Sequence, residues 1–194
     1  MLKRSISIVL LIGAGAVAIH AMAQQSQPSS EKAAPRAPAQ GPGPVQQQLA
    51  KRAGRWSMAK KLTMPGQAPM EATGTATISS VLGGRFIREE NEGMLFGQPV
   101  AAEMMSGYND ETEKYEVVWG WTGSNRLITA TGTSADGGKT VHLTSEYDSG
   151  KGKRESIIID QRVIDDDHFV VTLTSKMPNG KDGPTVESTY TRQK

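Results

Sequence analysis

The 194-residue chain contains no cysteine. This absence excludes a disulfide scaffold, a zinc–thiolate site, an iron–sulfur cluster, a thiol nucleophile and a Cys-anchored lipoprotein. The chain also lacks a strong excess of cations, since 22 Lys and Arg stand against 20 Asp and Glu and the formal net charge is +2. Nucleic-acid binding usually needs such an excess, so no nucleic-acid partner is expected. The length favours one domain.

The N-terminus carries two cations followed by a short apolar run. Lys3 and Arg4 precede the apolar or small stretch 5–19, and Ala21-Met22-Ala23 places small residues at the −3 and −1 positions of a cleavage site. This layout predicts a secretory signal peptide over 1–23, cleaved after Ala23, and a periplasmic or secreted protein that meets the membrane only through this signal. An uncleaved anchor is the alternative, although a bilayer core takes about 20 apolar residues.

A change of composition separates this segment from the rest of the chain. Residues 24–44 hold five of the ten prolines and no aromatic or branched aliphatic residue, which predicts a disordered Pro/Gln/Ala-rich linker. A docking segment for a partner is the alternative. Residues 45–194 form the expected domain, which starts with one or two helical turns over 45–53 that end at Gly54.

Beyond Gly54, short segments rich in Thr, Val, Ile, Tyr and Trp recur between turn residues such as Gly, Pro, Asn and Asp. They predict about ten strands, at 55–63, 70–80, 85–92, 98–108, 113–122, 125–133, 139–147, 154–164, 168–176 and 184–192. Short connections favour an antiparallel meander, and closure removes its two exposed edges. We therefore expect an all-β, up-and-down antiparallel barrel, with an open β-sandwich as the alternative.

Alternation of side chains along these segments predicts one wall of a pocket. Tyr115, Trp119 and Trp121 fall on the same face of their segment, which we assign to the interior. Their large apolar surface makes them ligand-pocket candidates, with Met104 and Tyr190 as secondary candidates. Filling of the core is the alternative role of the two tryptophans.

The segment 85–92 breaks the alternating pattern because both of its faces carry charge. One face holds Phe86, Arg88, Glu90 and Glu92, and the other holds Arg85, Ile87, Glu89 and Asn91. A buried carboxylate is costly unless it is paired or hydrated, so either the interior is polar here or this end of the strand extends past the rim. In a wet interior, Arg88 and Glu90 are the natural groups to orient a ligand and join the pocket candidates.

The first and last strands carry a pair of motifs. Gly54-Arg55-Trp56 begins the first strand, and Tyr190-Thr191-Arg192 ends the last. This pairing resembles the calycin superfamily, in which a Gly-x-Trp enters the base of the barrel and a basic residue packs across the indole. The resemblance implies that Trp56 closes one end of the barrel and that Arg192 lies over its ring, held by cation–π contact and hydrogen bonds.

A broader likeness extends from Leu49 to Arg192. Its matching stretches are Leu49-Ala50, Gly54-Arg55-Trp56, Gly83-Gly84-Arg85-Phe86, Glu89-Glu90, Glu92-Gly93, Gly107-Tyr108-Asn109, Lys114-Tyr115, Trp119, Met177-Pro178, Asn179-Gly180-Lys181 and Tyr190-Thr191-Arg192. In these stretches the sequence resembles the bacterial family called domain of unknown function 1579 (DUF1579). The resemblance implies a lipocalin-like barrel and no particular activity.

The sequence contains few residues that could ligate a metal ion or a haem. His142 and His168 are the histidines that remain after the signal, and neither has a partner at metal-ligand spacing. Nitrobindins, which are related ten-stranded haem barrels, take a histidine ligand from near the C-terminus, and no histidine follows His168 here. The run Asp165-Asp166-Asp167 lacks the spaced oxygen ligands of a calcium loop. We therefore expect no metal, no cofactor and no catalytic residue.

These observations leave three functions open. The leading hypothesis is an exported barrel that binds a small apolar or amphipathic molecule without catalysis. A filled barrel that acts through its surface as an envelope interaction module is one alternative. The other is an enzyme that uses Glu90, with Arg88 or Tyr115, as an acid–base set inside the barrel. The oligomeric state stays open.

Overall fold

The computed structural model describes residues 41–95, 97–148, 154–177 and 179–194. The predicted signal peptide and most of the predicted linker lie outside these residues. Within the described ranges, no helix combines the length and the apolar character needed to cross a membrane.

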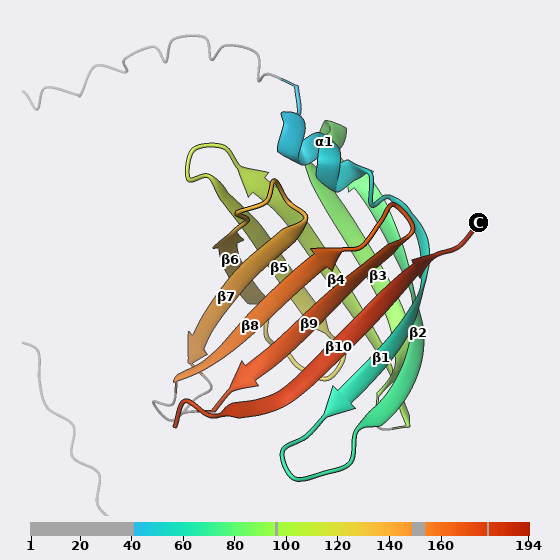
Figure 1. Cartoon of the computed structure of the whole chain (residues 1–194), viewed down its shortest axis with the longest axis vertical. Coiled ribbons are helices and arrows are strands. Elements are labelled where there is room, and N and C mark those ends of the chain that lie inside the picture. The colour runs from blue at the N-terminus through green and yellow to red at the C-terminus, as the bar shows by residue number, and fades with distance from the viewer. Residues whose placement is uncertain (1–40, 96, 149–153, 178) are drawn as a thin grey trace, which may run out of the picture. The chain divides into compact units, whose positions relative to one another are not determined.

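One short helix precedes ten strands, as the sequence predicts (Figure 1). The elements are α1 (Pro44–Ala50), β1 (Gly54–Thr63), β2 (Met70–Val81), the 3₁₀ turn η1 (Leu82–Gly84), β3 (Phe86–Leu95), β4 (Gln98–Asn109), β5 (Lys114–Trp121), β6 (Ile128–Thr133), β7 (Thr140–Asp148), β8 (Arg154–Val163), β9 (His168–Lys176) and β10 (Asp182–Arg192). Each strand pairs antiparallel with the next, and β1 also pairs with β10, so the sheet closes into a barrel.

The strand ends differ from the sequence prediction by a few residues, and turn chemistry explains two of the differences. β6 starts at Ile128 rather than at 125, because the amide of Ser124 donates to the carbonyl of Trp121 (3.1 Å) and the Ser124 hydroxyl accepts from the amide of Arg126 (3.2 Å). β10 starts at Asp182, ahead of Pro184, because the register with β9 shifts between Asp182 and Thr185 and accommodates the proline.

Helix α1 lies at one end of the barrel (Figure 1) and contacts β3, β4 and η1. Pro44 occupies the first turn, where its missing N–H costs nothing. Leu49 enters the core, and Gln46 is also buried although it is polar. The Gln46 amide Nε2 donates to both carboxylate oxygens of Asp110 (3.0 and 3.1 Å) and to the carbonyl of Tyr108 (3.2 Å). These bonds fix the helix over the β4–β5 turn.

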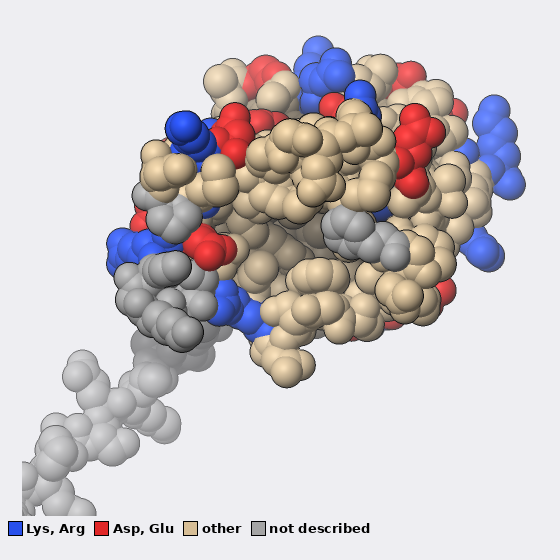
Figure 2. All heavy atoms as spheres, turned by 90° about the horizontal axis from the view of Figure 1, so that it is seen from below, with Lys and Arg blue, Asp and Glu red and all other residues tan. Residues whose placement is uncertain are grey.

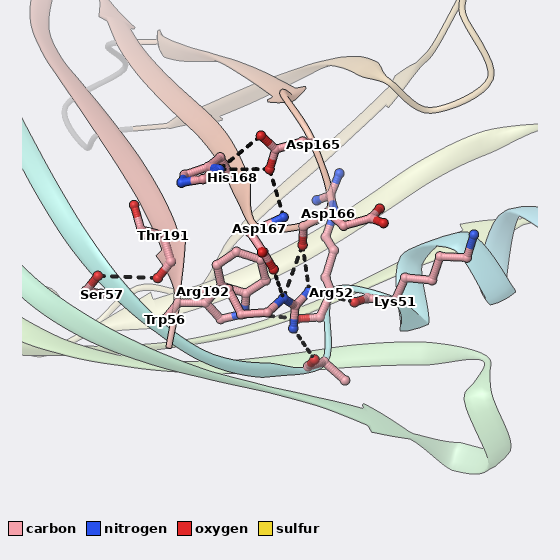
Figure 3. Close-up of polar contacts among 11 residues, drawn as sticks. Lys51, Arg52, Trp56, Ser57, Asp165, Asp166, Asp167, His168, Thr191 and Arg192 are labelled. Atoms are coloured by element: carbon pink, nitrogen blue, oxygen red, sulfur yellow. Dashed lines mark hydrogen bonds and ion pairs between the residues drawn. The ribbon is translucent and has the colours of Figure 1, made fainter. Parts of the chain in front are cut away.

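An indole and a guanidinium close the barrel below α1 (Figure 3). Trp56 of β1 stands opposite Arg192 of β10, and the Arg192 Cζ atom lies 4.2 Å from the centre of the indole. The guanidinium donates to the carbonyls of Ala53 (2.8 Å) and Lys51 (3.0 Å), and it pairs with the carboxylate of Asp167 (3.2 Å). Arg192 therefore joins the start of β1, the end of β10 and the β8–β9 turn.

Candidate functional site

The interior of the barrel is packed in the half near α1 and hollow in the other half. Inward side chains near α1 are almost fully covered, as Leu143 (0% exposed) and Trp56 (1%) show. Inward side chains nearer the opposite end are only partly buried, among them Trp121, Ile128, Tyr147, Leu173 and Val186. Figure 2 looks at that end and shows a central recess surrounded mostly by uncharged residues. The barrel is therefore a cup, closed at the α1 end.

The inner faces of β2, β4 and β5 carry side chains of very different size. Trp119 and Trp121 project inward from β5, and Met104 lies beside Trp119 on β4. Small residues occupy the inner faces of β2 and β4, namely Ala72, Gly74, Ala76 and Ala102. At the open end Trp121 is partly exposed, whereas Trp119, one layer deeper, is 8% exposed and belongs to the core.

The structure separates the pocket candidates of β4 and β5 into two groups. Trp119, Trp121 and Met104 lie together along the wall of the recess. Tyr115 lies at the α1 end of the same strand, in edge-on contact with Tyr108 at a centroid distance of 5.1 Å. It lines a different pocket of about 250 Å³, partly open, between α1 and the barrel base, together with Leu49, Arg52, Trp56, Phe169 and other residues.

Arg88 and Glu90 do not face the interior, contrary to the interpretation of the sequence. They form an ion pair with each other (3.0 Å), and their side chains are 41% and 51% exposed. The neighbouring Glu89 takes the inward position and is only 7% exposed. Phe86 explains this choice of face: it packs on the outside against Gly107, where an added Cβ atom would lie 2.5 Å from its ring.

Glu89 is held by two side chains from inside the barrel. The Tyr190 hydroxyl donates to Oε1 of Glu89 (2.8 Å), and Asn91 Nδ2 donates to the same oxygen (3.1 Å). The second oxygen, Oε2, accepts no hydrogen bond from the part of the chain that the structure describes. Burial raises the pKa of Glu89, and the bonds from Tyr190 and Asn91 oppose that rise. Burial also raises the pKa of Tyr190 well above its usual value, and Glu89 adds to the effect.

Two cations accompany this carboxyl group inside the barrel. Arg52 donates from Nη1 to Oε1 of Gln161 (2.8 Å), and its guanidinium lies 5.4 Å from the ring centre of Phe169. Lys60 projects inward from β1, since it alternates with the buried Met58 and Leu62. Burial lowers the pKa of Lys60, and Glu89 opposes that change. The inner surface of the cup is thus apolar on its walls and ionic at depth.

In the described ranges, no three His, Asp or Glu side chains gather as a metal ion would require. The two histidines form separate surface pairs: His142 Nδ1 lies 2.7 Å from Asp160, and His168 Nδ1 lies 2.8 Å from Asp165.

The position of Glu89 makes stability depend on pH in a defined direction. Because the folded pKa of Glu89 is raised above its ordinary value of 4.5, the folded state binds more protons than the unfolded state between the two pKa values. Stability is therefore expected to fall as pH rises from about 4.5 through the folded pKa. Glu89→Gln removes the titrating carboxyl group and with it this loss of stability, so the variant gains stability relative to wild type as pH rises.

Urea unfolding between pH 4 and pH 8 measures this difference. Glu90→Gln is the matched control, since Glu90 is the adjacent carboxylate on the outer face. Lys60, Arg52 and Tyr190 face Glu89 in both variants, so their direct contributions are shared. Parallel pH profiles for Glu89→Gln and wild type would contradict the assignment of a raised pKa.

The family model described as "Protein of unknown function (DUF1579)" matches residues 41–192. The chain belongs to the DUF1579 family. The match begins just before α1 and ends at Arg192, so it covers the whole barrel and the residue that caps its base.

Solved structures show the same fold at low sequence identity. The S-type phycobiliprotein lyase CPES from Guillardia theta is 16% identical, with a TM-score of 0.56, over 77% of this chain and 93% of that one. Rv2717c from M. tuberculosis is 15% identical, with a TM-score of 0.56, over 79% and 99%. No curated protein matches the chain. For this DUF1579 protein the likenesses establish a lipocalin-like barrel.

Proposed function

We propose that this DUF1579 barrel binds a small amphipathic molecule in its recess and performs no chemistry on it. One observation carries the proposal: the partly exposed Trp121, next to the buried Trp119 on the inner face of β5, lines an open recess whose deeper part holds Glu89 and Lys60. An apolar wall with a few convergent polar groups is the usual make-up of a small-molecule site. The wall of β5 would cover the apolar part of the molecule, and the ionic groups would contact its polar end.

The geometry favours binding over the two alternatives. The barrel is filled only in its α1 half, so a surface-acting barrel with a filled interior fits the open half poorly. The acid–base set of Glu90 and Arg88 lies on the outer face, away from any ligand in the recess. A fold neighbour is named a phycobiliprotein lyase, and its likeness supports a shared barrel rather than a shared reaction.

The proposed place of action is the periplasm or the outside of the cell. The support is the basic, apolar and small-residue order of residues 1–23, followed by a proline-rich linker that would separate the barrel from the point of export.

A neutral fluorescent probe tests the binding proposal. N-phenyl-1-naphthylamine is expected to bind wild type saturably, with a rise in its fluorescence. Ala102→Phe places a ring opposite Trp121 on the inner face and is expected to weaken probe binding about tenfold or more, because the ring occupies the recess. Fluorescence titration gives both dissociation constants.

Ala101→Phe is the matched control. Ala101 precedes Ala102 on β4, so its side chain points to the outer face, and this variant is expected to bind the probe as wild type does. Absence of saturable binding to wild type, or equal weakening by the two substitutions, would refute a ligand site in the recess.

A further inference from the structure

The charged side chains that face the interior lie at two levels. At the mouth, the Tyr147 hydroxyl donates to Glu155 (3.1 Å), and the Arg126 guanidinium lies 4.8 Å from the ring centre of Tyr147. Among the described residues, this pair of contacts joins one acid and one base, so their formal charges balance. Deeper in the barrel, the two cations Arg52 and Lys60 accompany the one carboxyl group of Glu89.

Within the deeper level, Arg52 and one oxygen of Glu89 have partners among the described residues, whereas Lys60 has none. Gln161 and Phe169 hold the guanidinium of Arg52, while Tyr190 and Asn91 hold one oxygen of Glu89. The ammonium of Lys60 forms no hydrogen bond or ion pair with any residue in the described ranges. Its electrostatic interaction with Glu89 nevertheless raises the pKa of Lys60 against the effect of burial. The ammonium is not a fully buried atom, so it is open to solvent and available to pair with an anionic group.

We propose that the ligand of the recess is an amphipathic carboxylate whose head group pairs with Lys60. This inference rests on the proposed function, since it assumes that the recess binds a ligand. The apolar chain of such a ligand would extend from Lys60 along Trp119 and Trp121 toward the mouth.

The number of donors favours a carboxylate over other head groups. Ser188 is the cross-strand neighbour of Lys60 on β10 and faces inward, so one ammonium and one hydroxyl are available side by side. Two donor groups, one ammonium and one hydroxyl, can each contact one oxygen of a carboxylate, whereas a phosphate presents more oxygens and more charge. A cationic head group would meet two cations against one acid, and burial of Glu89 weakens even that acid by favouring its neutral form.

Three molecules with the same apolar chain and different heads test the charge preference. Decanoate, decan-1-ol and decylamine are each titrated against wild type loaded with N-phenyl-1-naphthylamine, and loss of probe fluorescence reports displacement. Decanoate is expected to displace the probe at a concentration about tenfold lower than decanol, as a charge-assisted hydrogen bond would provide. Decylamine is expected to be the weakest of the three.

Variants of two adjacent lysines test whether the preference for decanoate over decanol depends on Lys60. Lys60→Met is expected to remove the advantage of decanoate over decanol, and Lys60→Arg is expected to retain it, because arginine keeps the charge. Lys61→Met is the matched control, since Lys61 neighbours Lys60 on β1 but is exposed on the outer face, and it is expected to behave as wild type. Thermal unfolding of each variant verifies that it is folded.

The outcomes distinguish this inference from the proposed function. Equal displacement by the three heads, or a decanoate preference that survives Lys60→Met, overturns the carboxylate assignment and leaves the binding function in place. Stronger displacement by decyl phosphate than by decanoate overturns the choice of carboxylate among anions. Failure of the neutral probe to bind wild type refutes the binding function itself.

Discussion

Replacement of Trp56 with alanine is expected to lower the free energy of unfolding by about 3–5 kcal/mol, the usual cost of deleting a buried aromatic side chain. Trp56 is 1% exposed, and its ring meets Phe169 edge-on at a centroid distance of 4.8 Å. Its Nε1 atom also donates to the carbonyl of Arg52 (3.0 Å). Truncation leaves a cavity and an unpaired carbonyl at the closed end. Urea unfolding followed by far-UV circular dichroism measures the loss.

Trp121→Ala is the control for this substitution. Trp121 is partly exposed in the recess, so its removal leaves less of a cavity and a smaller loss of stability is expected. A loss for Trp56→Ala no larger than that for Trp121→Ala would mean that the indole is not the structural plug of the barrel.

Replacement of Arg192 with methionine is expected to cost about 2–4 kcal/mol, because three carbonyl groups lose a charged donor at once. The guanidinium donates to the carbonyls of Lys51, Ala53 and Asp166, all within 3.1 Å, and it covers the indole of Trp56. Methionine keeps much of the apolar stem, so the loss reports the guanidinium rather than packing. Urea unfolding again gives the free energy.

Arg55→Met provides the matched control at the same end of β1. Arg55 is exposed, and its replacement is expected to change stability by no more than about 0.5 kcal/mol. Added salt is expected to change the Arg192→Met loss little, since the carbonyl bonds rather than the Asp167 ion pair supply most of it. A loss equal to that of Arg55→Met would contradict the bridging role of Arg192.

Local patterns in the sequence predict the strands of this barrel well. The ten segments and their turns can be recognised in the sequence because turn residues such as Pro65-Gly66 and Asn179-Gly180 alternate with β-branched and aromatic runs. Antiparallel neighbours follow from short connections, so nine of the ten pairings need only adjacent segments. The alternation of Tyr115, Trp119 and Trp121 likewise suffices to place their face inside.

The charged strand β3 could not be oriented in this way, since each face offers one aromatic or aliphatic residue followed by charge. The structure turns Ile87 and Glu89 inward because Phe86 finds space over Gly107 on the outside. The signal for that space, a glycine on the next strand, becomes informative only when the register of β3 and β4 is known.

The deepest part of the candidate site depends most on tertiary structure. Glu89 and Tyr190 are 101 positions apart in the chain, and Lys60 belongs to a third strand. No local pattern relates them, because their meeting requires the β1–β10 pairing that closes the barrel.

The sequence by itself therefore determined the elements, their antiparallel order and the apolar face of β5, since each of these depends on neighbours in the chain. Only the tertiary structure decided which carboxylate enters the barrel, which inward cation has no partner among the described residues, and which half of the interior is open. Those properties depend on the register and closure of the whole sheet, and on side chains that meet across its interior.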